Sequence, residues 1–293
     1  MEYQVKFDQG MINRGNWKKI KECMKKAERG EDITTGFLGG SITQGSLSST
    51  PQTCYAYLVY EWWKKKFPES EITFVNAGIG GTTSQFGVSR VKEHLLSYQP
   101  DFVLIEFAVN DENTEFFEET YEGLVRTTLS DACRPAVMLM NNVRYDDGLN
   151  AEEMHLKVAK AYALPMVSMK ETIWPEIESG RIKNREITPD DLHPNDAGHA
   201  LVARVITTLC IPGSICLVTV SIYRQSPHVS LKFPSNTIAV SSLPSTVTFA
   251  MGVGCLTLLR YCTAMPVPSI SKVILSPTWL PVHPLLKISR ILS

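Results

Sequence analysis

Five short apolar segments alternate with segments of helical periodicity over the first two hundred residues of the chain. The apolar segments occupy residues 33–38, 72–75, 101–107, 136–140 and 165–169. Strands that are buried on both faces have such near-continuous apolar runs, and helices between them are typical of parallel connections. We therefore predict an α/β fold with a central five-stranded parallel sheet that is covered on both faces.

The segments between the predicted strands carry apolar residues three and four positions apart. The first predicted helix follows Asn16, a suitable N-cap, and ends near Gly30, which suits the C′ position. The remaining helices are predicted near residues 55–62, 84–96, 116–129, 151–162 and 201–209.

The charge composition changes near residue 211. Of the 29 Lys and Arg residues in the chain, six lie in residues 212–293, but none of the 30 Asp and Glu residues does. We therefore predict a catalytic domain over residues 1–211 and a separate C-terminal tail over residues 212–293. One expectation is that the tail is weakly ordered, as a product of out-of-frame translation would be. The other is a small accessory β-rich region, because segments 238–240 and 246–249 have strand character.

The overall charge and the cysteine count exclude several classes of protein. A formal net charge of −1 provides no field for holding nucleic acid or an anionic membrane surface. The seven cysteines lack CxxC spacing, which argues against a disulfide framework and a zinc site. The first 21 residues lack the pattern of a secretory signal, and the apolar run 247–259 is too short to span a bilayer, so we expect a cytoplasmic protein.

Polar and glycine-rich loops follow three of the predicted strands, and a fourth precedes the last helix. They are Gly-Gly-Ser at 39–41, Asn-Ala-Gly-Ile-Gly-Gly-Thr-Thr at 76–83, Ala-Val-Asn-Asp at 108–111 and Asp-Asp-Leu-His-Pro at 190–194. The carboxyl ends of parallel strands meet at one edge of the sheet, where ligands bind. We therefore expect these loops to form one site.

In this order, the four loops resemble the four sequence blocks of the SGNH/GDSL hydrolase family, and the resemblance covers about residues 31–211. It implies a flavodoxin-like three-layer α/β/α sandwich, a serine nucleophile near the N-terminus and a late Asp/His pair. The first block departs from the family pattern, with Gly-Gly-Ser at 39–41 in place of Gly-Asp-Ser. The third block has Ala108 where glycine is usual. Neither departure removes a reacting group.

Nucleophilic catalysis assigns roles to two of these residues. A serine hydroxyl needs a base to take its proton, and histidine suits that task, so we predict Ser41 as nucleophile and His193 as general base. Asp190 and Asp191 are both close enough in sequence to orient the imidazole. The family spacing Asp-x-x-His selects Asp190 and leaves Asp191 as a loop carboxylate that faces solvent or a backbone amide.

An ester carbonyl becomes an oxyanion during hydrolysis and needs hydrogen-bond donors already in place. The resemblance implies that these donors are the backbone amides of Ser41 and Gly81 and the side-chain amide of Asn110. Glycines 39 and 40 would allow a sharp turn before the nucleophile and leave room for an acyl group.

The sequence gives less support to two other classes of function, dinucleotide binding and non-catalytic carbohydrate binding. The glycine loop at 78–81 hints at dinucleotide binding, but Thr83 occupies the third glycine position of GxGxxG and the loop follows the second strand. A non-catalytic carbohydrate-binding relative would have little reason to keep Ser41, Asn110 and His193 together. No GxSxG, HExxH or Walker motif is present, and we expect no cofactor and no metal.

The predicted substrate is an ester of a small acyl group, with acetyl on a carbohydrate as first choice and a short-chain lipid ester or acyl thioester as the alternative. Glu106 lies inside an apolar strand and must have a polar partner, with a structural or a catalytic role left open. His199 is expected to be a helix residue near the cap. Trp62 and Trp63 are expected to be core or interface aromatics.

Overall fold

The structure is a computed structural model that describes residues 5–210 in full. Beyond them it describes only the strand segments 216–226, 229–232, 237–240, 246–252, 255–257 and 270–274, without their side chains. The chain forms two compact units, Met1–Cys210 and Ile211–Ser293.

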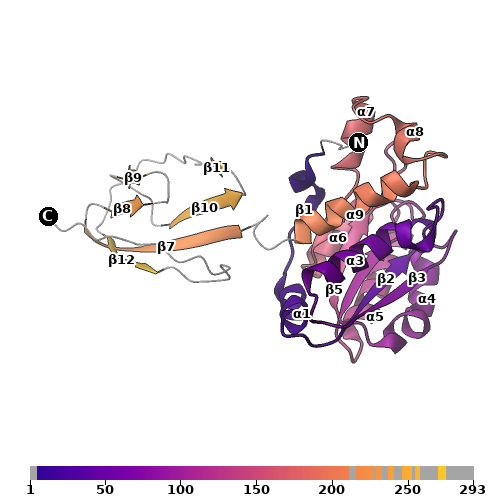
Figure 1. The fold of residues 1–293 in the computed structure, drawn as a ribbon, viewed down its shortest axis with the longest axis horizontal. Helices are drawn as coiled ribbons and strands as arrows, with labels where there is room; N and C mark the ends of the chain where they lie inside the picture. Colours follow the sequence, from indigo (N-terminus) through magenta and orange to yellow (C-terminus); the bar gives the residue numbers. More distant parts are fainter. Residues whose placement is uncertain are drawn as a thin grey trace. The chain divides into compact units, whose positions relative to one another are not determined.

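The first unit contains a six-stranded sheet with the order β1-β6-β5-β4-β2-β3 (Figure 1). Five strands are parallel and match the predicted apolar segments: β2 (Ile33–Gly39), β3 (Ile72–Gly78), β4 (Phe102–Glu106), β5 (Ala136–Asn141) and β6 (Met166–Ser168). The sixth, β1 (Met11–Asn13), pairs antiparallel with β6 at the edge. The predicted α/β fold is confirmed, but the count of five strands was wrong, because the half-buried edge strand β1 has only two apolar residues and therefore no apolar run.

Helices cover both faces of this sheet. In one layer α4 (Ser84–His94) packs against α5 (Glu115–Ser130), which packs against α6 (Glu152–Ala161). In the other layer α3 (Tyr55–Lys66) packs against α9 (Asp196–Cys210), and α1 (Lys18–Glu28) contacts β2 and β5. Short elements complete the unit: α2 (Ser41–Gln44), α7 (Ile173–Glu178), α8 (Asn184–Ile187), η1 (Phe7–Gly10), η2 (Pro51–Thr53) and η3 (Leu96–Tyr98).

The two predicted boundaries of α1 are close to those observed. Asn16 Oδ1 accepts a hydrogen bond from the Lys18 N–H at 2.9 Å, although the residue in the N-cap position is Trp17. Gly30 has a φ of 74°, a left-handed conformation that glycine adopts without steric cost.

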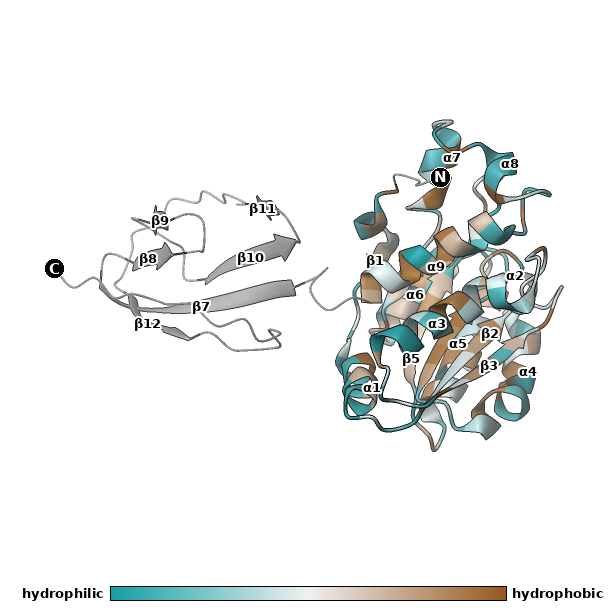
Figure 2. Cartoon of the chain, viewed as in Figure 1, coloured by the Kyte–Doolittle hydropathy of each residue, from teal (hydrophilic) through white to brown (hydrophobic). Residues whose placement is uncertain are grey.

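The core lies between the sheet and the helices. In Figure 2 hydrophobic strands lie between the helical layers, and the outer faces of the helices are hydrophilic. Phe107, Tyr121 and Leu124 are fully buried in the cluster beneath α4, α5 and α6. Beneath the other layer Trp63 is fully buried, with its ring centroid 5.3 Å from that of Phe102. Burial of each such side chain contributes roughly 1.5–3 kcal/mol, so these clusters hold the strands in register. The expectation that Trp63 is a core aromatic is confirmed.

The register of the central strands determines where the site forms. Gly39, the last residue of β2, pairs with Gly78 of β3 on one side and with Glu106 of β4 on the other. All three strands therefore end at the same level. The loops that follow them begin side by side.

In the second unit the described strands form two antiparallel sheets. One has the order β11-β10-β7-β12, and the other pairs β8 with β9. Segments 238–240 and 246–249 lie in β9 (Thr237–Val240) and β10 (Thr246–Gly252); the other strands are β7 (Cys216–Ser226), β8 (Val229–Lys232), β11 (Cys255–Thr257) and β12 (Ile270–Ile274). The predicted weak order of the tail concerns packing that lies outside the described residues. Among the described helices none is long and apolar enough to cross a bilayer.

Candidate active site

Ser41 stands at the point where β2 turns into α2. A Cβ added at Gly39 would lie 2.5 Å from the Glu106 carbonyl oxygen, and one at Gly40 would lie 2.8 Å from Asn110 Oδ1. At Gly39 the contact is with backbone, so this position has no room for a side chain, whereas at Gly40 it is with the end of the Asn110 side chain, which a larger residue could displace. Ser41 itself is 7% exposed and is the first residue of α2, so its N–H has no acceptor within that helix.

Two hydrogen bonds connect Ser41 to the fourth predicted loop, residues 190–194. His193 Nε2 lies 2.8 Å from Ser41 Oγ, and His193 Nδ1 lies 2.7 Å from Asp190 Oδ2. Because an ionised carboxylate only accepts hydrogen bonds, the proton of a neutral ring belongs on Nδ1. Nε2 is then free to accept the proton of the serine hydroxyl.

The Asp190 carboxylate is fixed by several donors. Its Oδ1 accepts hydrogen bonds from the backbone N–H groups of Leu192 at 3.1 Å and His193 at 2.7 Å. Burial raises the pKa of Asp190, but the hydrogen bonds from the His193 side chain and from these backbone groups outweigh burial and lower the pKa to about 2. Asp190 is therefore ionised at neutral pH and held in place before any substrate arrives.

Asp191 does not face the histidine. Its Oδ2 forms an ion pair with Arg185 Nη2 at 2.7 Å, and its Oδ1 accepts a hydrogen bond from Asn184 Nδ2. Its backbone oxygen accepts the Tyr145 N–H at 2.7 Å, and its φ is 69°. The expected loop carboxylate is thus partly exposed to solvent, but its partners are side chains of α8 rather than a backbone amide.

The loop after β3 passes beside the nucleophile. A Cβ at Gly80 would lie 3.7 Å from the Cβ of Ser41. The loop is held there because the Ile79 N–H donates to the Gly39 oxygen at 3.0 Å and the Gly80 N–H donates to Gln44 Oε1 at 2.8 Å. Gly81 has a φ of 69°, and a Cβ there would meet no atom within 4 Å, so Gly81 borders open space.

Asn110 reaches the same place from the loop after β4. Its Oδ1 lies against Gly40, is buried and has no hydrogen-bond partner within residues 5–210. The structure thus brings Ser41, His193 and Asp190 into direct hydrogen-bonding contact and places Asn110 Oδ1 against Gly40. Gly81 directly follows Gly80, whose Cβ position lies 3.7 Å from that of Ser41.

His199, the other histidine near this region, has a different environment. It is buried in α9, where its Nδ1 accepts the Tyr55 N–H at 3.2 Å and its Nε2 faces the Ser46 oxygen at 3.3 Å. Burial lowers its pKa to about 4, so the ring is neutral at pH 7. Its ring connects α9 to the start of α3, which is a structural role.

Glu106 is the last residue of β4 and is fully buried. Its Oε1 accepts the Ala108 N–H at 3.1 Å, which supplies the polar partner that the sequence required. Burial raises its pKa to about 7. The contact fixes the start of the loop that carries Asn110.

Several residues around the site were missed from the sequence. Arg90 of α4 is buried and donates to the carbonyl oxygens of Ala77 and Gly39 at 2.6 and 3.0 Å, which ties α4 to the ends of β2 and β3. Asp196 Oδ1, at the start of α9, accepts hydrogen bonds from the Ser49 N–H and Thr53 Oγ1 at 2.8 and 2.7 Å. An arginine within a helix or an aspartate at a helix start carries no sequence signal of such a role.

No three His, Cys, Asp or Glu side chains are grouped to hold a metal ion within the part of the chain that the structure describes.

A family model of the GDSL-like lipase/acylhydrolase family matches residues 37–201, which include every predicted site residue. The chain belongs to this family. This GDSL-like chain is 62% identical to a two-domain esterase active on acetylated mannans, whose crystal structure was obtained with mannopentaose. That match has a TM-score of 0.70 and covers 70% of this chain but only 56% of the esterase.

Two further relatives of the GDSL-like chain are more distant. Thioesterase 1/protease 1/lysophospholipase L1 of Escherichia coli (strain K12) is 27% identical over 175 residues, which are 57% of this chain and 77% of that protein. An acetyl xylan esterase from Geobacillus stearothermophilus is 20% identical with a TM-score of 0.51, and the match covers 61% of this chain and 94% of the esterase. At that identity the likeness supports the fold alone.

Proposed function

We propose that this GDSL-like protein is a serine esterase that removes small acyl groups, acetyl first among them, from carbohydrates. The observation that carries the proposal is the hydrogen-bonded chain from Ser41 Oγ through His193 to Asp190, with separations of 2.8 and 2.7 Å. The 62% identity to an esterase active on acetylated mannans supports the choice of acetyl and of carbohydrate.

In the first half of the reaction Ser41 Oγ attacks the carbonyl carbon of the ester while His193 Nε2 takes the hydroxyl proton. The Asp190 carboxylate, 2.7 Å from Nδ1, stabilises the resulting imidazolium. The carbonyl oxygen becomes an oxyanion, which the N–H groups of Ser41 and Gly81 and the Asn110 amide would bind. Collapse of this intermediate breaks the bond to the sugar oxygen, which receives the proton from His193.

In the second half water replaces the sugar. His193 takes a proton from the water, whose oxygen attacks the acyl carbon on Ser41, and the oxyanion forms in the same place. Cleavage of the acyl–serine bond returns the proton to Ser41 Oγ and releases acetate. No electron transfer occurs, so the residues already described suffice for both halves.

Release of acetate from polysaccharides tests the substrate class. We would compare initial rates on acetylated mannan, acetylated xylan and p-nitrophenyl esters of increasing acyl length. The proposal expects acetate release from acetylated mannan and a rate on p-nitrophenyl esters that is highest for acetyl and falls with length. No release from either polysaccharide, together with a preference for long acyl chains, would contradict it.

The alternative is a short-chain lipase or an acyl thioesterase with the same nucleophile. The identity of 27% to thioesterase 1/protease 1/lysophospholipase L1 of Escherichia coli favours it. A lysophospholipid and an acyl thioester in the same panel distinguish the two, because the alternative expects the highest kcat/KM on one of them.

A further inference from the structure

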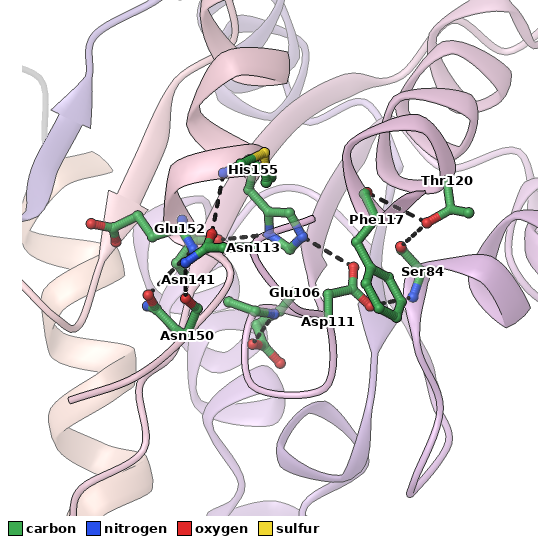
Figure 3. A network of polar contacts seen from close by, with 12 residues as sticks. Ser84, Glu106, Asp111, Asn113, Phe117, Thr120, Asn141, Asn150, Glu152 and His155 are labelled. Atoms are coloured by element: carbon green, nitrogen blue, oxygen red, sulfur yellow. Dashed lines mark hydrogen bonds and ion pairs between the residues drawn. The ribbon is translucent and has the colours of Figure 1, made fainter. Parts of the chain in front are cut away.

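A network of polar contacts with buried residues at its centre joins Ser84, Asp111 and His155 (Figure 3). At its centre His155 of α6 has no exposed surface. Its Nε2 lies 3.0 Å from Asp111 Oδ2, and its Nδ1 lies 3.1 Å from Asn141 Oδ1. Its ring stacks on Tyr121 with a centroid separation of 3.6 Å and an interplanar angle of 5°.

The other oxygen of Asp111 makes the contact that matters for the site. Asp111 Oδ1 accepts a hydrogen bond from the Ser84 N–H at 2.9 Å. Ser84 is the first residue of α4, and the preceding Thr83 makes no side-chain capping bond to the helix. The carboxylate therefore takes the place of an N-cap, in a position where the helix dipole favours negative charge.

This hydrogen bond joins the two loops that would hold the oxyanion. Asp111 directly follows Asn110, and Ser84 lies three residues after Gly81. The loop of Gly81 is attached to β2 and α2 at its beginning, through Ile79 and Gly80. The Asp111–Ser84 contact attaches its end to the loop of Asn110.

A buried carboxylate and a buried imidazole are costly to desolvate, and satisfied hydrogen bonds are needed to offset that cost. Burial lowers the pKa of His155, which favours the neutral ring, so its contact with Asp111 is a hydrogen bond rather than an ion pair. Stacking on Tyr121 holds the ring in place. Asp111 cannot rotate without losing this bond. Its Oδ1 consequently presents one fixed position to the N–H of Ser84.

We propose that Asp111, held by His155, is a positioning residue that sets the separation between the Asn110 amide and the Gly81 N–H in the oxyanion site. The inference rests on the proposed function, since it needs Asn110 and Gly81 to act on the same oxygen. Asp111 touches no substrate in this account. It acts through the two loops that it connects.

A pair of variants at Ser84 isolates the hydrogen bond. Ser84→Pro removes the N–H that Asp111 accepts and puts the proline Cδ in its place, which displaces the Asp111 carboxylate, while proline suits the first residue of a helix. The residue before it, Thr83, has φ −102° and ψ 172°, an extended conformation that proline favours in its neighbour. Ser84→Pro also removes the hydroxyl that lies 2.8 Å from Thr120 Oγ1, so Ser84→Ala, which keeps the N–H, is the matched control.

A pair of variants at Asp111 tests the same contact from its other side. Asp111→Ala removes both acceptors. Asp111→Asn keeps an oxygen for the Ser84 N–H, and its amide can donate to His155 Nε2 when the ring proton is on Nδ1, where Asn141 Oδ1 accepts it. The asparagine variant is therefore expected to restore most of what alanine loses.

The experiment measures kcat and KM on p-nitrophenyl acetate and the rate of covalent labelling by a fluorophosphonate, in the full chain, with thermal unfolding as the check of folding. We expect Ser84→Pro and Asp111→Ala to lower kcat and the labelling rate by about tenfold or more with little change in KM, because a small misplacement of oxyanion donors costs up to ~10²-fold. Ser84→Ala and Asp111→Asn should stay within a few-fold of the unmodified protein.

Folded Ser84→Pro with unchanged kcat would overturn the inference while leaving the proposed function intact. Equal losses in Asp111→Ala and Asp111→Asn would overturn it as well, as would a loss confined to KM. If Ser84→Pro does not fold, the Asp111 pair decides. An unmodified protein that neither hydrolyses acetyl esters nor labels would overturn the proposed function and this inference together.

Discussion

His193 Nε2 lies 2.8 Å from Ser41 Oγ although 152 positions separate the two residues in the chain. The contact arises because β2 ends at the carboxyl edge of the sheet and the loop before α9 returns to the same edge. Ser41 and His193 each stand one or a few residues from a helix start, where packing on the sheet fixes the backbone. The fold thus brings these two side chains into contact.

Replacement of Asp190 by asparagine tests which aspartate orients His193. Asp190→Asn removes the charge that stabilises the imidazolium and disturbs the ring proton, so we expect kcat to fall by ~10³–10⁴-fold with a modest change in KM. Asp191→Asn is the matched control. It weakens a partly exposed ion pair with Arg185, which contributes about 0–1 kcal/mol, and should leave kcat within a few-fold. The opposite ranking would transfer the role to Asp191, and two mild effects would indicate a Ser41–His193 dyad.

Asn110→Ala removes the side-chain amide proposed to bind the oxyanion. We expect kcat on p-nitrophenyl acetate to fall by ~10²–10³-fold, the usual cost of losing one such donor. Asn113→Ala on the same loop serves as control, because the Asn113 amide donates to the Asn150 oxygen at 2.9 Å and supports the loop. This control should lower the Tm but leave kcat within a few-fold of the unmodified protein. Similar kcat values for both variants would argue against Asn110 as a donor.

Glu106 predicts a pH dependence of stability. Its pKa is 4.5 in the unfolded reference and about 7 in the fold, so the folded protein holds the proton more tightly. Its contribution to stability is complete below pH 4.5 and is lost as the pH rises through 7. Glu106→Gln has no titrating group at this position and should not show this loss. Between pH 5 and pH 8 the unfolding free energy of the unmodified protein should therefore fall by roughly 3 kcal/mol more than that of the variant, at ~1.4 kcal/mol per pKa unit. Urea denaturation at both pH values measures it; equal changes in the two proteins would exclude a buried, titrating Glu106.

Removal of residues 212–293 tests the proposed domain division. Every residue of the candidate site lies within residues 1–211, so a chain ending at 211 should fold and keep measurable hydrolysis of p-nitrophenyl acetate. Circular dichroism of the shortened chain checks its folding. A folded but inactive product would show that the tail contributes to the site.

The sequence predicted the strands that contain an apolar run. Strands β2, β4 and β5 are buried along almost their whole length, and β3 and β6 overlap the shorter apolar runs 72–75 and 165–169. β1 is a three-residue edge strand, and Asn13 in it is held through side-chain bonds to the oxygens of Ala159 and Leu164. The short helix α8, which positions Asp191, has too few residues for a periodic pattern. Elements of that size depend on tertiary contacts rather than on local propensity.

The candidate site could be predicted because its residues stand in four loops whose order resembles that of the family. The positioning residues behind it could not. Asp111 and His155 are 44 positions apart, and their contact depends on how α6 is placed on the sheet. A single histidine on a helix and an aspartate after an asparagine carry no signal of this pairing.

The central claim, that Ser41 is the nucleophile, is tested most directly by covalent labelling with a fluorophosphonate followed by peptide mass spectrometry. We expect one label per chain, on the peptide that contains Ser41, and complete loss of labelling and of esterase turnover in Ser41→Ala. That variant should keep its Tm within a few degrees, because it removes one oxygen at the edge of the site. Stoichiometric labelling of a different serine, or undiminished labelling of folded Ser41→Ala, would contradict the account.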